Sequence, residues 1–480
     1  MTRPQVASRS EVAIGLRASG CAATSRRGSL LYNRYIGIDG GGTKTAAVLC
    51  AALTAVFGAT LAACAAEASA QMPSPQLLRR IKEGPEIISI VHWGPNTYTD
   101  REWGFGDEAP ESVNPAKFDA DQIVGACKAG GIGGIILVCK HHDGFCLWPT
   151  KTTEHNISRS PFRGGRGDCV REVEQACRRA GLKFGVYVSP WDRNNAKYGF
   201  PEYVETYHEQ FRELCGGAYG EIFEAWFDGA NGGDGWYGGA KERRTIPKDY
   251  YRFDELHEWL RKRQPSITFM GTKAKARDFN WPGNERGVIP ENASNSSDGR
   301  FRMFEADFPL RQGWFYHERN KGRTKSGLQL ARIYFTSVGR GGTMNIGVAL
   351  DKDGLVCEED ARKLKDFKRI IDALFAHEAA PGEPFNIVEL REDLSRGENV
   401  KDWELLADDR LIASGRYVGA KRLVTFKSPV SPCRLAVNVP DVSVRRFLAP
   451  QRLLSEVIGA AGAKETDTAK RMHKGAQDGQ

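Results

Sequence analysis

The stretch EIFEAWFD, residues 221–228, decides the fold: an apolar, aromatic-rich run of strand type delivers one carboxylate, Asp228, at its end. Two upstream stretches share this layout. GGIGGIILVCK (130–140) runs into a His-His-Asp sequence, and LKFGVYVSPW (182–191) ends on a tryptophan. In a parallel β/α barrel, the C-terminal ends of all strands open on one face, where the chemistry lies. The three stretches therefore predict reactive side chains gathered in one pocket.

Amphipathic segments separate these strands. In 168–180, Val170, Val173 and Cys177 recur at helical spacing, with arginines and glutamates between them. Similar segments lie at 119–129, 201–214, 249–263 and 326–338. Alternating strands and helices are typical of a parallel sheet covered by helices. We therefore expect an α/β fold, a (β/α)8-like TIM barrel over residues 80–380.

The remainder of the chain predicts a second domain and two ends outside the core. From residue 381, short β-prone runs alternate with Gly and Asp turns, which is typical of a β-sandwich, here 381–454. Residues 455–480 have the composition of a disordered tail. The net charge of +8 comes from 68 basic and 60 acidic residues that are interspersed, so no nucleic-acid surface is expected. The eleven cysteines include no close C-x-x-C pair, which argues against a zinc or redox site.

Residues 1–70 read as an N-terminal extension with an export signal. Ala46 to Ala63 is an uncharged, Ala-rich stretch that follows basic residues and precedes an A-x-A sequence at 68–70. Within it, Leu61 to Cys64 resembles a lipobox, in which Cys64 would carry a lipid. The stretch is too short and too weakly apolar for a spanning helix. We expect an exported protein, periplasmic or extracellular, either released or anchored to the membrane through Cys64.

A second N-terminal motif points to a different class of protein. IGIDGGGTKT (36–45) resembles the phosphate-binding hairpin of sugar kinases and actin-like ATPases. Those proteins need a second phosphate loop and an adenosine motif, and the sequence shows neither. A kinase is therefore the less favoured interpretation, and no nucleotide or other cofactor is predicted.

The central residues carry a family resemblance. In order and spacing, six motifs look like the α-L-fucosidases of glycoside hydrolase family 29: HWGPNTYTDREWG (92–104), HHDGFCLWPT (141–150), GVYVSPWDRN (185–194), WFDGANG (226–232), GNERG (283–287) and GWFYH (313–317). The resemblance implies a retaining exo-glycosidase on a barrel. TDREWG, SPWDRN and GNERG are more similar to the members specific for α-1,3- and α-1,4-linked fucose. Fucosylated oligosaccharides or glycoconjugates are the implied partners.

Two carboxyl groups would perform this chemistry. A retaining glycosidase places them about 5 Å apart, one as nucleophile and one as acid and base. By the resemblance, Asp228 would form a covalent fucosyl-enzyme and Glu285 would protonate the leaving oxygen. Glu291 and Glu305 are the alternatives to Glu285 in this region. The sequence departs from the family just before Gly-Asn-Glu, where Arg-Trp is often found and Asn280, Trp281 and Pro282 stand instead.

The resemblance also implies the residues that line a fucose pocket: His92, Glu102, Trp103, His141, His142, Tyr187 and Trp226. Aromatic rings would cover the methyl and C–H faces of fucose, and polar groups would bind its hydroxyls. No metal is predicted, because neighbouring histidines on an extended strand point to opposite faces and cannot easily hold one ion. The alternative from a different class is a non-catalytic glycan-binding protein that keeps this pocket.

Overall fold

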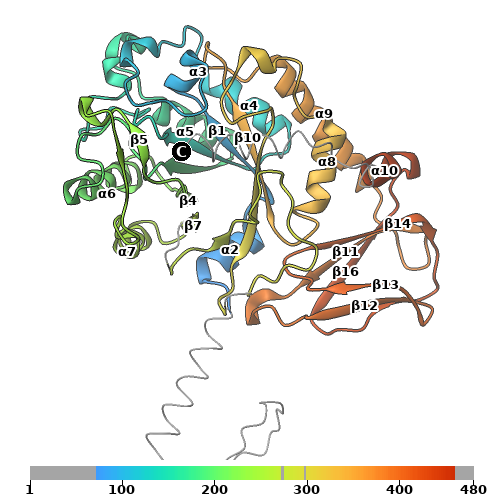
Figure 1. The fold of residues 1–480 in the computed structure, drawn as a ribbon. Coiled ribbons are helices and arrows are strands. Elements are labelled where there is room, and N and C mark those ends of the chain that lie inside the picture. The colour runs from blue at the N-terminus through green and yellow to red at the C-terminus, as the bar shows by residue number, and fades with distance from the viewer. Residues whose placement is uncertain (1–71, 272–274, 297–298, 460–480) are drawn as a thin grey trace, which may run out of the picture. The chain divides into compact units, whose positions relative to one another are not determined.

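The computed structural model describes residues 72–271, 275–296 and 299–459. Eight parallel strands form a nearly closed barrel with the order β7-β4-β3-β2-β1-β10-β9-β8 (Figure 1). The strands are β1 (Ile87–His92), β2 (Gly134–Lys140), β3 (Lys183–Val188), β4 (Glu224–Trp226), β7 (Thr268–Met270), β8 (Phe279–Asn280), β9 (Met303–Pro309) and β10 (Thr343–Ala349). The predicted barrel is confirmed.

Helices cover the outside of the barrel. They are α4 (Ala120–Ala129), α5 (Cys169–Ala180), α6 (Pro201–Cys215), α7 (Phe253–Arg263), α8 (Gly327–Thr336) and α9 (Glu358–Leu374). Two shorter helices are α2 (Pro75–Glu83) and α3 (Pro95–Thr99). The five predicted helices are present. For α5 the ends follow from local chemistry: Asp168 accepts a hydrogen bond from the Arg171 amide, and Gly181 adopts φ 73° after the last turn. The helix at 249–263 begins four residues later than predicted, because Arg252 has φ 50° and lies outside the helix.

Alternate residues of the strands face two separate cores. On β2, Ile135 and Leu137 pack outward against the helices, whereas Ile136 and Val138 point into the barrel. This is the two-residue period of a strand that is buried on both faces. Leu77 of α2 joins the inner core.

Among the described residues, no strand ladder joins β7 to β8, the two ends of the strand order. Here Asp278 makes the connection: its amide donates to the Phe269 carbonyl at 2.9 Å, and its carboxylate accepts from the Phe269 amide at 2.8 Å. The same carboxylate accepts from Arg261 and from Ser74, both at 2.6 Å. Within the described ranges, no helix lies between β7 and β9. One residue, Asp278, therefore bonds β7 through both its backbone amide and its side chain at this join.

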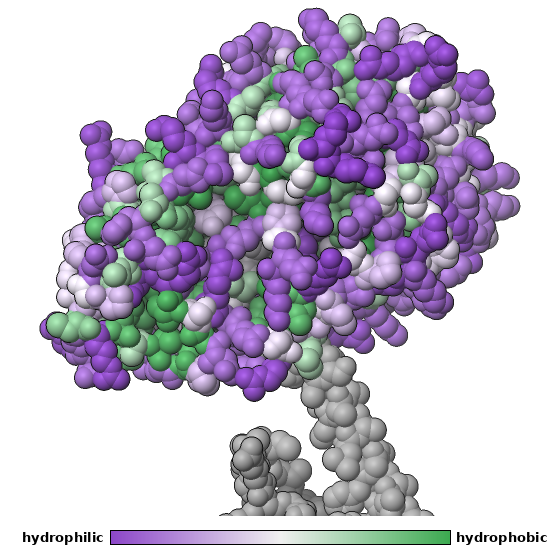
Figure 2. Space-filling view, turned by 180° about the vertical axis from the view of Figure 1, so that it is seen from behind, coloured by the Kyte–Doolittle hydropathy of each residue, from purple (hydrophilic) through white to green (hydrophobic). Residues whose placement is uncertain are grey.

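Two antiparallel three-stranded sheets follow the barrel, in the orders β14-β11-β16 and β13-β12-β15. Their strands are β11 (Phe385–Glu392), β12 (Asp402–Ala407), β13 (Arg410–Arg416), β14 (Arg422–Val430), β15 (Leu435–Val437) and β16 (Val442–Phe447). Phe385, Val388, Trp403 and Leu405 belong to their common core, as expected for a sandwich. From behind, hydrophilic side chains cover most of the surface, and smaller hydrophobic areas lie between them (Figure 2). Leu411 of β13 is one of the exposed large hydrophobic side chains.

The C-terminal end differs from the prediction. Helix α10 (Gln451–Ile458) continues into residues that were predicted to begin a disordered tail. Its Leu454 and Val457 are buried, and Arg332 of α8 donates to the Val457 carbonyl at 2.9 Å. The sequence 455–458 is therefore helical because it packs on the barrel. The predictions for residues 1–70, Cys64 included, and for the last residues of the tail lie outside the described ranges.

In the part of the chain that the structure describes, every helix is too short or too polar to cross a membrane. The eight cysteines described there are all free, and Cys127, Cys139 and Cys177 are buried as predicted. A short hairpin, β5 (Gly233–Gly235) with β6 (Glu242–Arg244), follows the end of β4.

Candidate active site

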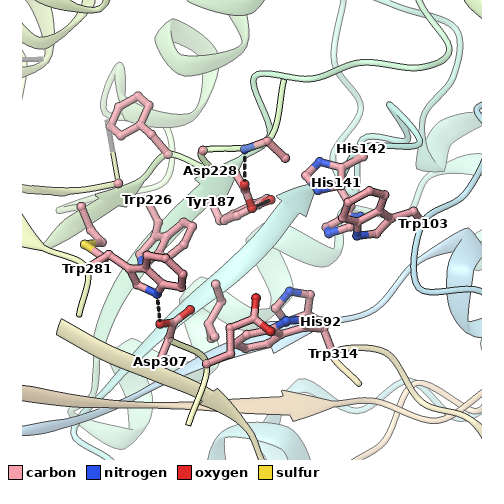
Figure 3. Close-up of a pocket in the computed structure, with 17 residues that line it drawn as sticks. His92, Trp103, His141, His142, Tyr187, Trp226, Asp228, Trp281, Asp307 and Trp314 are labelled. Carbon is pink, nitrogen blue, oxygen red and sulfur yellow. Dashed lines mark hydrogen bonds between the residues drawn. The ribbon is translucent and has the colours of Figure 1, made fainter. Parts of the chain in front are cut away.

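A cavity of about 310 Å³ opens at the C-terminal ends of the barrel strands (Figure 3). This volume lies near the lower end of the usual range for small-molecule sites. Eight of the nine residues predicted for the site line it: His92, Trp103, His141, His142, Tyr187, Trp226, Asp228 and Glu285. They come from β1, β3, β4 and the loops that follow the strands. The ninth, Glu102, is not among the lining residues.

Asp228 lies two residues beyond the end of β4 and is fixed by two donors. The Tyr187 hydroxyl donates to its Oδ2 at 2.8 Å, and the Ala230 amide donates to its Oδ1 at 2.6 Å. Burial raises the pKa of Tyr187 well above its usual value, with a further contribution from the Asp228 charge. The phenol therefore remains a donor at any working pH. Both oxygens of Asp228 are thus held while the carboxylate faces the cavity.

Glu285 lies in a turn that follows β8. The Asn284 side chain ties this turn together: its Nδ2 donates to the Val288 carbonyl at 2.8 Å, and its Oδ1 accepts from the Arg286 amide at 3.1 Å. Gly287 closes the turn with φ 70°, a conformation that favours glycine. Neither alternative glutamate lines the cavity. Glu305 is buried inside the barrel, and Glu291 lines a separate groove near the sandwich.

Three buried histidines form one side of the cavity. Burial lowers the pKa of His92 to about 3 and of His142 to about 4, and it lowers the pKa of His141 well below the usual value. All three are therefore neutral near pH 7. The rings of His141 and His142 lie 4.0 Å apart between centroids, and both line the cavity. The expectation that they face opposite ways is wrong, because they follow the end of β2 and are not part of the strand.

Hydrogen bonds to Nδ1 assign different roles to His141 and His142. Nδ1 of His141 lies 3.4 Å from the Asn96 amide nitrogen, which can only donate, so the proton of His141 is on Nε2. Nδ1 of His142 lies 2.7 Å from Ser189 Oγ, whose own hydrogen goes to the Trp191 carbonyl. The proton of His142 is therefore on Nδ1. One imidazole keeps a donor at Nε2 and its neighbour keeps an acceptor, which suits hydroxyl groups.

Glu102 acts on the cavity wall through its neighbours. Its carboxylate accepts from the Trp314 amide at 2.8 Å and from the Phe315 amide at 3.3 Å. The imidazole of His317, which is buried, lies between this carboxylate at 2.5 Å and that of Asp100 at 2.6 Å. Trp314 in turn lines the cavity and lies against His92. The resemblance implied that Glu102 lines the fucose pocket, whereas in the structure its carboxylate bonds the Trp314 and Phe315 amides and His317.

Trp226 forms the floor and is held from inside the barrel. Its ring stacks on Tyr187 at 5.4 Å, and its Nε1 donates to Glu305 at 2.9 Å. Asn345 donates to the same Glu305 oxygen at 2.8 Å. Burial, reinforced by Glu305, raises the pKa of Glu224 well above its usual value. A protonated Glu224 beside Glu305 avoids two buried like charges.

The sequence did not single out Trp281, Asp307 or Trp314 as site residues, yet all three line the cavity. Trp281 Nε1 donates to Asp307 at 2.7 Å (Figure 3). Burial raises the pKa of Asp307 well above its usual value, and the Glu285 charge acts in the same direction. Asp307 stands near the C-terminal end of β9, the position that had pointed to Asp228. That signal could have identified Asp307.

The described residues contain no cluster of three or more His, Cys, Asp or Glu side chains that could hold a metal ion. Two carboxylates, neutral imidazoles and aromatic walls at the C-terminal face of a barrel are the arrangement of a glycoside hydrolase that works with carboxyl groups.

Comparison with known proteins identifies the family. The profile of the α-L-fucosidase family matches residues 73–372, and the chain belongs to that family. Alpha-L-fucosidase 1 of Arabidopsis thaliana is 34% identical over 331 residues, which are 64% of this chain and 62% of the plant protein. The crystal structure of a glycoside hydrolase 29 family member from an unknown rumen bacterium is 33% identical, with a TM-score of 0.72. That match covers 79% of this chain and 78% of the bacterial one.

Proposed function

We propose that the protein is a retaining exo-α-L-fucosidase that releases terminal α-1,3- or α-1,4-linked fucose through a covalent fucosyl-enzyme. The observation that carries the proposal is that Asp228 and Glu285 line one cavity, together with neutral histidines and stacked aromatic rings. Membership of the α-L-fucosidase family supports the choice of sugar. Retention of both carboxyl groups argues against a glycan-binding protein without turnover.

In the first step, Asp228 attacks the anomeric carbon while Glu285 gives its proton to the departing oxygen. In the second step, Glu285 takes a proton from water, which attacks the same carbon and frees Asp228. Tyr187 and the Ala230 amide hold Asp228 in position for the attack. His141 and His142 offer a donor and an acceptor to the sugar hydroxyls, and Trp226 offers an apolar face for the ring.

We further propose that the α-1,3- or α-1,4-linked fucose is carried by a branched, Lewis-type glycan, and the rim of the cavity supports this preference. Trp103 and Trp281 line it from opposite sides and are nearly half exposed, at 46% and 47% (Figure 3). Exposed indole faces at a cavity mouth suit stacking against the sugars next to fucose. Trp103 is itself held against Trp191 and His142 by edge contacts. A branched substrate, which has a second sugar beside the one that carries fucose, would contact both indoles.

The test is fucose release from a Lewis-type trisaccharide, an α-1,2-fucosylated trisaccharide and an aryl α-fucoside, with Asp228→Asn as control. Removing the nucleophile should lower the rate by several orders of magnitude. Retention is read from the first-formed anomer of fucose by NMR, which should be α. A β product would refute the covalent intermediate, and efficient release from the α-1,2 substrate with the Lewis substrate untouched would refute the linkage preference.

Export is a further part of the proposal, and it rests on the apolar stretch at 46–63 and the A-x-A sequence at 68–70. The mass of the mature N-terminus, measured on protein made with its own leader, distinguishes the two routes. Cleavage after Ala70 indicates release, and a lipid on Cys64 indicates anchoring. An unprocessed Met1 would contradict both.

A further inference from the structure

The loop between β8 and β9 carries Glu285 and leaves the barrel to reach the sandwich. Its described parts are residues 281–296 and 299–302. We propose that the C-terminal sandwich positions this loop through Glu398 and Arg422, and so sets the acid and base steps of catalysis. The proposal rests on the role of Glu285 given above. It assigns the sandwich a part in the reaction.

Glu398 is the main contact. Its carboxylate is buried and accepts four hydrogen bonds from two residues of the loop. The Asn295 amide donates to both oxygens, at 3.2 and 3.1 Å, and Asn295 Nδ2 donates at 3.0 Å. Ser294 Oγ donates at 2.6 Å. A buried carboxylate is tolerated only when such donors satisfy it, so the loop and the sandwich hold each other in one geometry.

Arg422, at the start of β14, makes a second contact. Its Nη1 donates to the Glu291 carbonyl at 3.2 Å, while Nε and Nη2 donate to the Tyr417 carbonyl at 3.1 and 2.9 Å. Arg422 is 7% exposed, and its guanidinium bonds carbonyls of both the loop and the sandwich. The Leu423 amide donates to the Gly339 carbonyl at 2.9 Å, which attaches β14 to the segment after α8.

These anchors act on Glu285 through a stiff turn. The Asn284 side chain ties residues 282–288 into one body, as described above. Beyond that turn, Arg340 donates to the Ile289 carbonyl at 2.6 Å, and the Ile289 amide donates to the Thr336 carbonyl at 2.9 Å. The turn can therefore move only as a unit, and the contacts with α8 and the sandwich decide where it lies.

The expected effect is on proton transfer. A displacement of about 1 Å between a catalytic group and its substrate can lower a rate roughly 100-fold. Release of a sugar or alkyl alcohol requires the proton from Glu285, whereas release of an acidic phenol does not. Loss of the anchor should therefore slow hydrolysis of substrates that release a sugar or alkyl alcohol. Formation of the fucosyl-enzyme from substrates that release an acidic phenol should be nearly unchanged.

The experiment compares kcat/KM of the full chain and its Glu398→Ala variant on a Lewis-type trisaccharide and on a dinitrophenyl fucoside. We expect a loss of roughly 10- to 100-fold on the trisaccharide and less than about 3-fold on the aryl substrate. Glu398→Gln keeps an acceptor for Asn295 and should recover part of the loss. It also carries the test if Glu398→Ala fails to fold.

Asn386→Ala is the matched control. Asn386 is buried in the same sandwich and bonds the backbone of Ala449 at 2.8 Å, away from the loop. Asn386→Ala should lower stability, and any change in kcat/KM should be the same on the two substrates. Equal losses on the two substrates with Glu398→Ala, no loss, or the same pattern in Asn386→Ala would overturn the proposal. Failure of the proposed function is seen separately, as no fucose release by the unaltered chain or no leaving-group effect in Glu285→Ala.

Discussion

The hydrogen bond between Tyr187 and Asp228 predicts which catalytic step a Tyr187→Phe change affects. The phenol donates at 2.8 Å to the oxygen of a carboxylate that alternates between a free anion and an ester during turnover. Phenylalanine keeps the ring that stacks on Trp226 at 5.4 Å and removes only the hydroxyl. The bond is strongest to the free anion and weakest to the ester. Its loss should therefore disfavour the step that restores the anion, which is hydrolysis of the fucosyl-enzyme.

The size of the effect follows from the strength of a charge-assisted bond. Such bonds contribute about 1.5–3 kcal/mol, and a transition state with roughly half of the carboxylate charge restored would lose about half of that. A loss of about 0.8–1.5 kcal/mol corresponds to a decrease in kcat of roughly 4- to 12-fold. The first step, which determines kcat/KM, starts from the free anion. The value of kcat/KM should therefore not fall along with kcat.

The assay uses an aryl fucoside with an acidic phenol, for which hydrolysis of the intermediate limits turnover. We expect kcat and KM to fall together, and mass spectrometry of the quenched reaction to show more fucosyl-enzyme than in the unaltered protein. Tyr207→Phe is the control, because its buried hydroxyl bonds the Val188 carbonyl at 3.1 Å. Equal decreases in kcat and kcat/KM, without accumulation of the intermediate, would refute the reasoning and indicate that Tyr187 only orients Asp228.

Three further changes test other parts of the site. Because the pKa of His142 is lowered to about 4, the unfolded chain binds more protons than the folded one below about pH 6.5, so stability should decrease as the pH falls. In denaturant titrations, His142→Gln should reduce the difference in unfolding free energy between pH 7.5 and pH 5 by about 2 kcal/mol. The same difference in the variant and the unaltered protein would contradict this. Glu102→Gln should lower stability by about 1–2 kcal/mol and raise KM with little change in kcat, since it loosens Trp314; a loss confined to kcat would instead indicate contact with the reacting sugar. Gly287→Ala places a methyl group against α8 at a residue with φ 70° and should lower the free energy of unfolding by about 1–3 kcal/mol in thermal denaturation. Gly283→Ala should cost less, because φ is 78° there but the space is open. Equal effects would assign the cost to φ alone.

The strand-plus-carboxylate pattern was sufficient to predict the barrel and to place Asp228 in its cavity. Parallel strands leave no freedom in where their C-terminal ends lie, so a residue just after a strand is located by topology alone. The histidine pair was placed correctly for the same reason. Its ring orientations could not be predicted, because they depend on where β2 ends and on partners such as Ser189.

Long-range contacts explain what the sequence could not predict. Glu102 is directed away from the cavity by amides more than 200 residues away in the chain, and Glu398 meets Asn295 across 103 residues. Such pairings are not encoded in any local period, so a pattern of residue types identifies the neighbourhood of a site more readily than the direction of its side chains.

The join at Asp278 has a consequence for the spacing of the two proposed catalytic carboxyl groups. Asp228 follows β4, which neighbours β7, whereas Glu285 follows β8, so the two proposed catalytic carboxyl groups stand on opposite sides of that join. Their spacing determines whether a glycosidase keeps or inverts configuration. A fully laddered barrel would fix that spacing through many backbone bonds. Here the spacing crosses a join that Asp278 bridges, so it depends on the Asp278 hydrogen bonds and on the contacts that hold the loop after β8, and not on a continuous strand ladder.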